Sequence, residues 1–156
     1  MISNYKIFVY VIFFFNLSNI INISKCISKN VFIKEFLLIH GNLGIGKTTI
    51  INYIIKSLKN KTDYINSPTF NIKKRHKTLM MSILHYDLYR LKSIKEIYEL
   101  ELKKNSSVNI IIIEWGEITK HVLKLYYNEI FIFETCYNKI KRIYFIFNKL
   151  KKYLNY

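Results

Sequence analysis

The stretch that decides the fold is Gly41-Asn42-Leu43-Gly44-Ile45-Gly46-Lys47-Thr48, which Thr49 follows. It has the pattern GxxxxGK[ST] of a phosphate-binding loop, whose backbone N–H groups surround phosphate oxygens at the positive end of a helix. Three of the chain's four glycines fall within it. Because the rest of the sequence avoids glycine, we predict that residues 41–49 bind a nucleotide.

The flanking residues predict the strand and the helix that this motif requires. Residues 36–39 are a short apolar run that leads directly into the loop, as a buried strand would. Apolar residues then recur at spacings of three and four between residues 48 and 58, which indicates an amphipathic helix. In this setting the Lys47 ammonium should bridge the β- and γ-phosphates, the Thr48 hydroxyl should ligate Mg²⁺, and Thr49 should reach the α-phosphate.

Two further segments place polar side chains near the nucleotide. Ser67-Pro-Thr-Phe70 holds the only proline of the chain and follows the predicted helix, where many nucleotide hydrolases have a switch segment. A plain turn is the alternative. His85-Tyr-Asp-Leu-Tyr-Arg90 ends a second predicted strand, residues 79–88, so that Asp87 and Arg90 would lie at the sheet edge where α/β folds bind ligands. These two residues could instead pair with each other.

A third segment, Ile110-Ile-Ile-Ile-Glu114-Trp115, is an apolar run that ends in an acid. The second acidic motif of P-loop proteins holds magnesium from such a position, often through water. A buried strand that merely stops at a charge would give the same pattern. Glu114 is therefore a candidate metal-supporting residue.

The remaining pattern predicts one α/β domain of the P-loop NTPase class, residues 34–156. Helices are expected at 94–102 and 118–125 and a buried strand at 108–113, and strands at 129–133 and 139–147 should form a closing hairpin. We therefore expect a mostly parallel sheet with flanking helices and a C-terminal antiparallel hairpin.

The first 33 residues are predicted to be a removable leader. Lys6 precedes an apolar run at residues 7–15, which is too short to span a bilayer, and an acid-free stretch rich in Asn, Ser and Lys follows. A two-part leader into a plastid fits this order, and mitochondrial import is the alternative. If residues 1–30 are instead an ordinary strand and loop, the protein is cytoplasmic. No stable membrane association is expected after leader removal.

The formal charge of +15 suggests a polyanionic partner such as tRNA. The lysines are scattered over the whole chain, however, so a solvated surface accounts for them equally well. Only two cysteines occur, which argues against a disulfide framework.

Taken in order, GNLGIGKTT, SPTF, HYDLYRL and IIEWGE resemble the TsaE (YjeE) family of small ATPases over about residues 36–148. The resemblance implies ATP and Mg²⁺ as cofactors. It also implies TsaB- and TsaD-type partners, which place threonylcarbamoyl on the adenosine next to the anticodon, with tRNA reached through that complex. Slow ATP hydrolysis would then reset the complex between rounds.

The resemblance further assigns roles to single residues. It implies nucleotide binding by residues 41–49 and Trp115, metal support by Thr48, Thr69 and Glu114, and catalysis by Lys47, Asp87 and Glu114. Whether Asp87 orients water or assists the metal stays open, and Trp115 could equally be a core residue. The chain departs from the family at Asn42 and Ile45, which replace acidic and small residues, and its leader takes the place of an N-terminal helix.

Other function classes remain possible from sequence. A P-loop kinase for a small metabolite would need several arginines over the phosphates, and the chain has three in all. A GTPase is disfavoured because no Asn-Lys-x-Asp segment is present. A basic, nucleotide-bound scaffold that binds tRNA or protein without useful hydrolysis is the alternative from another class.

Overall fold

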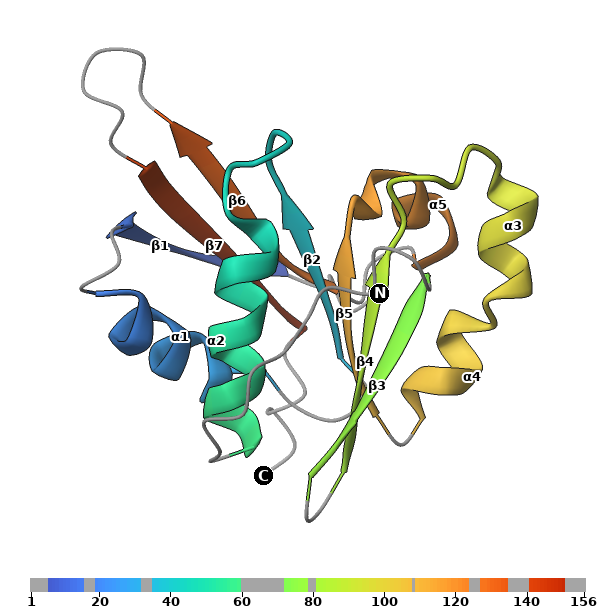
Figure 1. Cartoon of the computed structure of the whole chain (residues 1–156), viewed down its shortest axis with the longest axis horizontal. Helices are drawn as coiled ribbons and strands as arrows, with labels where there is room; N and C mark the ends of the chain where they lie inside the picture. Colours follow the sequence, from blue (N-terminus) through green and yellow to red (C-terminus); the bar gives the residue numbers. More distant parts are fainter. Residues whose placement is uncertain are drawn as a thin grey trace, which may run out of the picture.

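The computed structural model describes residues 6–15, 19–31, 35–59, 72–78, 81–107, 109–123, 127–134 and 141–150, and for 6–15 and 141–150 it describes the backbone. The described strands form one sheet in the order β1-β7-β6-β2-β5-β4-β3 (Figure 1). They are β1 (Lys6–Phe15), β2 (Phe36–His40), β3 (Lys73–Lys77), β4 (Ser82–Asp87), β5 (Asn109–Glu114), β6 (Tyr127–Glu134) and β7 (Lys141–Leu150). The helices are α1 (Ile20–Ser28), α2 (Lys47–Lys59), α3 (Ile94–Glu99), α4 (Leu102–Ser106), the 3₁₀ helix η1 (Gly116–Thr119) and α5 (Lys120–Leu123).

The centre of the sheet is parallel. β2 pairs in parallel with β5 and β6, and β5 pairs in parallel with β4. Every residue of β2 and β5 is buried, as expected for apolar strands covered on both faces. β2 therefore delivers the glycine loop to the carboxyl edge at the middle of the sheet, where α/β folds bind ligands.

Two hydrophobic layers enclose the sheet. Leu37 and Ile39 of β2 pack with α1 and α2, whereas Phe36 and Leu38 on the opposite face pack with apolar residues of α3, α4 and α5. In Figure 1, α1 and α2 lie on one side and α3 and α4 lie on the other. The alternation along β2 shows why a continuous apolar run is needed there, since both faces are core.

The outer strands are antiparallel and complete the predicted architecture. β6 and β7 form the expected C-terminal antiparallel hairpin, and β1 pairs with β7. At the other edge, the strand predicted at 79–88 is confirmed as β4, whereas β3, which pairs antiparallel with β4, was not predicted. The basic sequence of β3, Lys73–Lys77, lacks the apolar alternation by which strands are recognised.

The helix predicted at 94–102 begins at Ile94 as expected but ends at Glu99 as α3, and a second short helix, α4, begins at Leu102. Glu101 lies between α3 and α4 with φ 46° and ψ 42°, a left-handed conformation that no α-helix can pass through. The helix predicted at 118–125 begins as the 3₁₀ turn η1 and continues as α5 to Leu123, and residues 124–125 lie outside the described residues. The helix after the glycine loop is confirmed, and it runs from Lys47 to Lys59.

The segment assigned to a leader contributes to this fold. β1 pairs with β7, and α1 buries Ile20, Ile23 and Ile27 in the same hydrophobic cluster as α2. The hydroxyls of Ser28 and Ser57 lie 2.9 Å apart where the two helices meet. A helix does therefore precede β2. Removal of residues 1–33 stays a prediction, and it would take this packing away. No helix in the described part of the chain is long and apolar enough to cross a membrane.

Candidate active site

The glycine loop owes its shape to three residues with positive φ. Gly41, Gly44 and Gly46 have φ values of 144°, 73° and 111°. A Cβ on Gly41 would lie 2.7 Å from the carbonyl oxygen of Ile132 on β6, a contact too short to tolerate. Ile45 is buried in the layer under α2. The loop therefore packs against β6 at Gly41 and against the core at Ile45.

Lys47 is the first residue of α2 and points back into the loop. Its Nζ donates hydrogen bonds to the carbonyl oxygens of Gly41, at 2.7 Å, and Asn42, at 2.8 Å. The side chain is only 5% exposed, and burial lowers the pKa of the ammonium, opposed by the charges of Glu114 and Glu117. A cation is therefore held where the phosphates of a nucleotide would enter.

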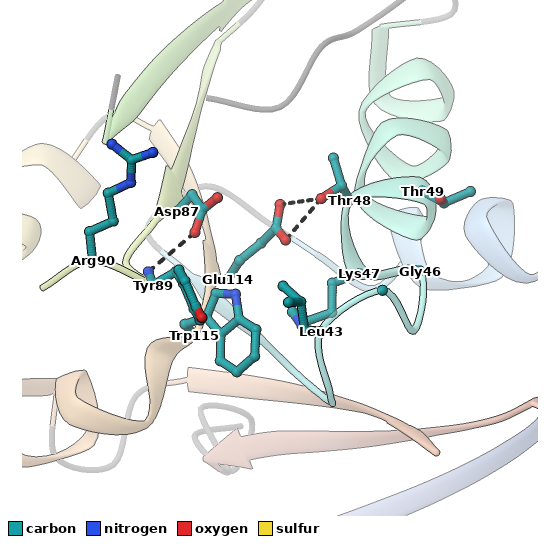
Figure 2. Close-up of a pocket in the computed structure, with 11 residues that line it drawn as sticks. Leu43, Gly46, Lys47, Thr48, Thr49, Asp87, Tyr89, Arg90, Glu114 and Trp115 are labelled. Atoms are coloured by element: carbon teal, nitrogen blue, oxygen red, sulfur yellow. Dashed lines mark hydrogen bonds between the residues drawn. The ribbon is translucent and has the colours of Figure 1, made fainter. Parts of the chain in front are cut away.

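The indole ring of Trp115 contacts the Lys47 ammonium on the side away from the loop carbonyls. Lys47 Nζ lies 3.6 Å from the centroid of the indole ring, and the Tyr89 ring centroid lies 5.0 Å from it (Figure 2). Trp115 has φ 59° and ψ 42°, which is rare for a bulky residue and costs roughly 1–3 kcal/mol. This strained turn directly after β5 places the ring over Lys47, and the half-buried ring also packs against the core on the side of α3, α4 and α5.

Thr48 and Glu114 meet across the space between α2 and β5. The Thr48 hydroxyl donates to the Glu114 carboxylate and lies 3.0 Å from each of its oxygens (Figure 2). Glu114 is only 3% exposed, and its Oε1 also lies 2.9 Å from Nε2 of His85 on β4. Two oxygen ligands suited to a hard cation are therefore adjacent, and their predicted role in metal binding stays a prediction.

Asp87 lies beside Glu114, since the register of β4 and β5 pairs these two residues. Its Oδ1 accepts a hydrogen bond from the Tyr89 N–H at 3.2 Å. Burial raises the pKa of the Asp87 carboxyl; the Tyr89 N–H opposes this shift and the Glu114 charge adds to it. Asp87 and Arg90 form no ion pair with each other, so the carboxylate remains directed at the site (Figure 2).

These side chains surround one cavity of about 410 Å³. Its lining includes most of the residues predicted from sequence: Leu43, Gly44, Gly46, Lys47, Thr48, Thr49, Asp87, Glu114 and Trp115. The remaining loop residues, Gly41, Asn42 and Ile45, belong to the loop but do not line the cavity. Thr69 and the rest of residues 67–70 lie outside the described residues, so their predicted switch role stays a prediction.

The residues present fit a magnesium–nucleotide complex. No group of three or more His, Cys, Asp or Glu side chains that could hold a metal occurs among the described residues. Mg²⁺ does not need one, because it is usually bound by one or two carboxylates together with phosphate oxygens and water. Thr48 and Glu114 supply that limited set of protein oxygens.

Sequence reasoning missed two features next to the site. His85 was part of a recognised motif but received no role, although its position two residues before Asp87 on a strand predicts the same face. Tyr89 belongs to the same motif, and no pattern in the sequence indicated that its ring packs on Trp115.

The second feature is a cluster of charges behind the loop. His40 Nδ1 lies 2.8 Å from Glu117 and its Nε2 lies 2.9 Å from Glu129, which also pairs with Lys120. Burial, the largest influence, lowers the pKa of His40, but the hydrogen bond to Glu117 and the ion pair with Glu129 outweigh it and leave that pKa raised. No local pattern relates residues so far apart in sequence.

Comparison with known proteins identifies the family. The profile described as "Threonylcarbamoyl adenosine biosynthesis protein TsaE" matches residues 15–142. The chain belongs to the TsaE family. The matched range begins before α1, so it includes the helix that the sequence had assigned to a leader.

Three relatives illustrate the similarity within the TsaE family. Each is named tRNA threonylcarbamoyladenosine biosynthesis protein TsaE. The protein of Rickettsia prowazekii is 44% identical over 102 residues, covering 65% of this chain and 71% of the relative. That of Streptomyces coelicolor is 34% identical, covering 53% and 57%, and that of Aquifex aeolicus is 31% identical, covering 55% and 61%.

A solved structure supports the fold. The crystal structure of Bacillus subtilis YdiB superposes with a TM-score of 0.69 and covers 94% of this chain and 90% of YdiB. The sequences are 18% identical, so this similarity concerns the fold. The P-loop α/β architecture predicted from sequence is thereby confirmed.

Proposed function

We propose that this TsaE-family chain is the ATP-binding and ATP-hydrolysing component of the machinery that makes threonylcarbamoyladenosine in tRNA. One observation carries the proposal most strongly: Lys47, Thr48, Asp87 and Glu114, from three separate motifs of the chain, line one cavity at the carboxyl edge of the sheet. The relatives' names supply the pathway.

Each of these residues has a proposed task in hydrolysis. The loop backbone and the Lys47 ammonium bind the β- and γ-phosphates and balance their charge. Thr48 and Glu114 hold Mg²⁺, which when bound neutralises charge on the phosphate oxygens. Thr49 is proposed to reach the α-phosphate, and Trp115 to cover the nucleotide from the side of β5.

Asp87 is proposed to orient the attacking water and accept its proton. Its carboxylate lines the cavity beside Glu114, and burial raises its pKa above the ordinary value of 3.8. A more basic carboxylate is a better general base near neutral pH. The Tyr89 N–H holds Oδ1 by a hydrogen bond, which leaves Oδ2 for a water molecule.

The proposed partners are TsaB- and TsaD-type proteins, with tRNA reached through their complex. Around the cavity, Leu43 and Tyr89 are 74% and 58% exposed, so apolar surface surrounds the nucleotide entrance. A partner that covers this surface would exclude water from the site and complete it, which gives a physical reason for slow hydrolysis by the chain alone.

The kinase alternative lacks support around the cavity. Arg90 is the one arginine that lines it in the described part of the chain, whereas a kinase needs several cationic side chains over the transferred phosphate. A non-catalytic scaffold would bind ATP as an ATPase does, so only a measurement of ATP hydrolysis distinguishes the two.

An organellar location, plastid before mitochondrion, is proposed on the leader pattern at residues 1–33. Because α1 is part of the core, the position of the cleavage site decides whether the mature protein keeps this packing. The N-terminus of the mature chain, sequenced after isolation from cells, would show whether α1 is retained.

The proposal is tested by measuring ATP turnover with TsaB- and TsaD-type proteins and tRNA, added singly and together. We expect low turnover by the chain alone and an increase when the complete set is present. Equal turnover under all conditions would contradict the proposed role in the modification complex, and matched additions of unrelated basic and acidic proteins control for non-specific effects.

A further inference from the structure

We propose that His85 is a positioning residue that fixes the Glu114 carboxylate for magnesium binding. This inference rests on the proposed magnesium-dependent function of the same site. It concerns a residue that does not line the nucleotide cavity and to which neither the motif nor the cavity assigns a role.

The contact that carries this inference is buried and specific. His85 has no exposed surface, and its Nε2 lies 2.9 Å from Oε1 of Glu114. A carboxylate oxygen accepts hydrogen bonds, so Nε2 is the protonated nitrogen that donates. The two residues come from neighbouring parallel strands, in which His85 pairs with Ile112, two positions before Glu114.

Two donors approach the carboxylate from different elements. His85 donates from β4 and Thr48 donates from the first turn of α2. A glutamate carboxyl group turns easily about its last torsion, which has no sharp minima. One donor would leave that rotation largely free, whereas two donors on separate elements define the plane of the group. Removing His85 should therefore loosen Glu114 without touching the phosphate loop.

The surroundings of His85 suit a fixed imidazole. Its Nδ1 has no hydrogen-bond partner, so the contact with Glu114 is the one that orients the ring within the described structure. His76 on β3 lies on the same face, with its ring centroid 6.3 Å away, and it is also buried. His76 makes no contact with Glu114 and therefore provides a matched control.

Carboxylates that support a metal are commonly held by such outer partners, whose loss costs about 10–100-fold in metal affinity or activity. Without His85, the buried Glu114 carboxylate keeps its desolvation cost while only the Thr48 hydroxyl still donates to it. The carboxylate then adopts several orientations, few of which can bind the cation.

The test compares His85→Gln with His85→Asn. Both carry a side-chain amide that can donate, but only the longer glutamine amide reaches the position of Nε2. His76→Gln is the control for changing a buried histidine on the same face. The measured quantities are the affinity for ADP without Mg²⁺, the gain in that affinity when Mg²⁺ is added, and the rate of ATP hydrolysis.

We expect all three variants to bind ADP without Mg²⁺ as the unmodified chain does. His85→Asn should lose the Mg²⁺-dependent gain and turn over ATP about 10–100-fold more slowly. His85→Gln should retain most of both, and His76→Gln should retain both. Circular dichroism and thermal unfolding confirm that each variant is folded.

The inference is overturned if His85→Asn keeps the full Mg²⁺-dependent gain, or if His76→Gln loses as much of it as His85→Asn does. Should the unmodified chain hydrolyse no ATP under any condition, the proposed function fails. The Mg²⁺-dependent gain in ADP affinity would still decide the role of His85, so the two failures are distinguishable.

Discussion

The ammonium of Lys47 lies 3.6 Å from the centre of the Trp115 ring and donates to two carbonyl oxygens of its own loop. Contacts within the chain therefore hold the P-loop lysine in place. A bound nucleotide must compete with these contacts, of which the cation–π contact is worth about 0.5–2 kcal/mol. The ring that holds the lysine is also the only tryptophan of the chain.

This arrangement predicts an intrinsic signal for nucleotide binding. When phosphates attract Lys47 Nζ, its distance from the Trp115 ring changes, so the tryptophan emission should change with ADP concentration and saturate. Lys47→Met should abolish the response together with binding. A saturable binding curve by calorimetry without any change in emission would show that the contact does not respond to the nucleotide.

A second prediction concerns the glycines of the loop. Gly41→Ala should destabilise the protein by about 1–3 kcal/mol through overpacking against β6, in addition to backbone strain of similar size. Gly44→Ala is the matched control, because a Cβ there meets nothing within 4 Å and only the left-handed strain of about 1–2 kcal/mol remains. Urea unfolding measures both; equal losses would mean that the contact with Ile132 is unimportant.

The position of α1 in the core gives a third prediction. Ile27 is fully buried, so Ile27→Ala should cost about 2–5 kcal/mol of unfolding free energy. Ile21 on the same helix is 49% exposed, and Ile21→Ala should change stability by less than about 0.5 kcal/mol. If both variants unfold like the unmodified chain, α1 does not belong to the folded domain, and that result would support the prediction that residues 1–33 are a removable leader.

The charge cluster at His40 predicts a pH-dependent contribution to stability. The folded pKa of His40 is raised above its ordinary value of 6.5, so its contribution is complete below that value and is lost as the pH rises through the folded pKa. The pKa values of Glu117 and Glu129 are lowered from 4.5, so their contribution is present above 4.5 and is lost in acid.

His40→Gln should therefore lose more stability between pH 4.5 and 6.5 than in alkaline solution. Urea unfolding across this range, with His121→Gln on exposed surface as the control, measures the difference. A loss independent of pH would mean that the charged form of His40 contributes nothing.

The sequence predicted those parts of the fold that local pattern determines. The glycine loop, its helix and the buried strand at β5 follow from apolar spacing and a fixed motif. The hairpin of β3 and β4 was missed because the residues of β3 are almost all basic. The break at Glu101 was missed because a left-handed glutamate has no sequence signal.

The site was predictable to the extent that its residues belong to motifs. Asp87 and Glu114 could be predicted as candidates because each ends a strand next to the phosphate loop. His85 and His40 contact residues distant in sequence, and no local pattern relates such residues. The leader pattern shares its segment with two elements of the fold: the apolar run at residues 7–15 forms β1, and the stretch rich in Asn, Ser and Lys that follows contains α1.

The proposed ATPase function is tested most directly by measuring ATP affinity and ATP turnover together for Asp87→Asn. ATP affinity should stay unchanged, because Lys47 and the loop are proposed to hold the phosphates, and turnover should fall about 10²–10⁴-fold with the loss of the proposed general base. Undiminished turnover by Asp87→Asn would show that this chain does not hydrolyse ATP in the proposed way.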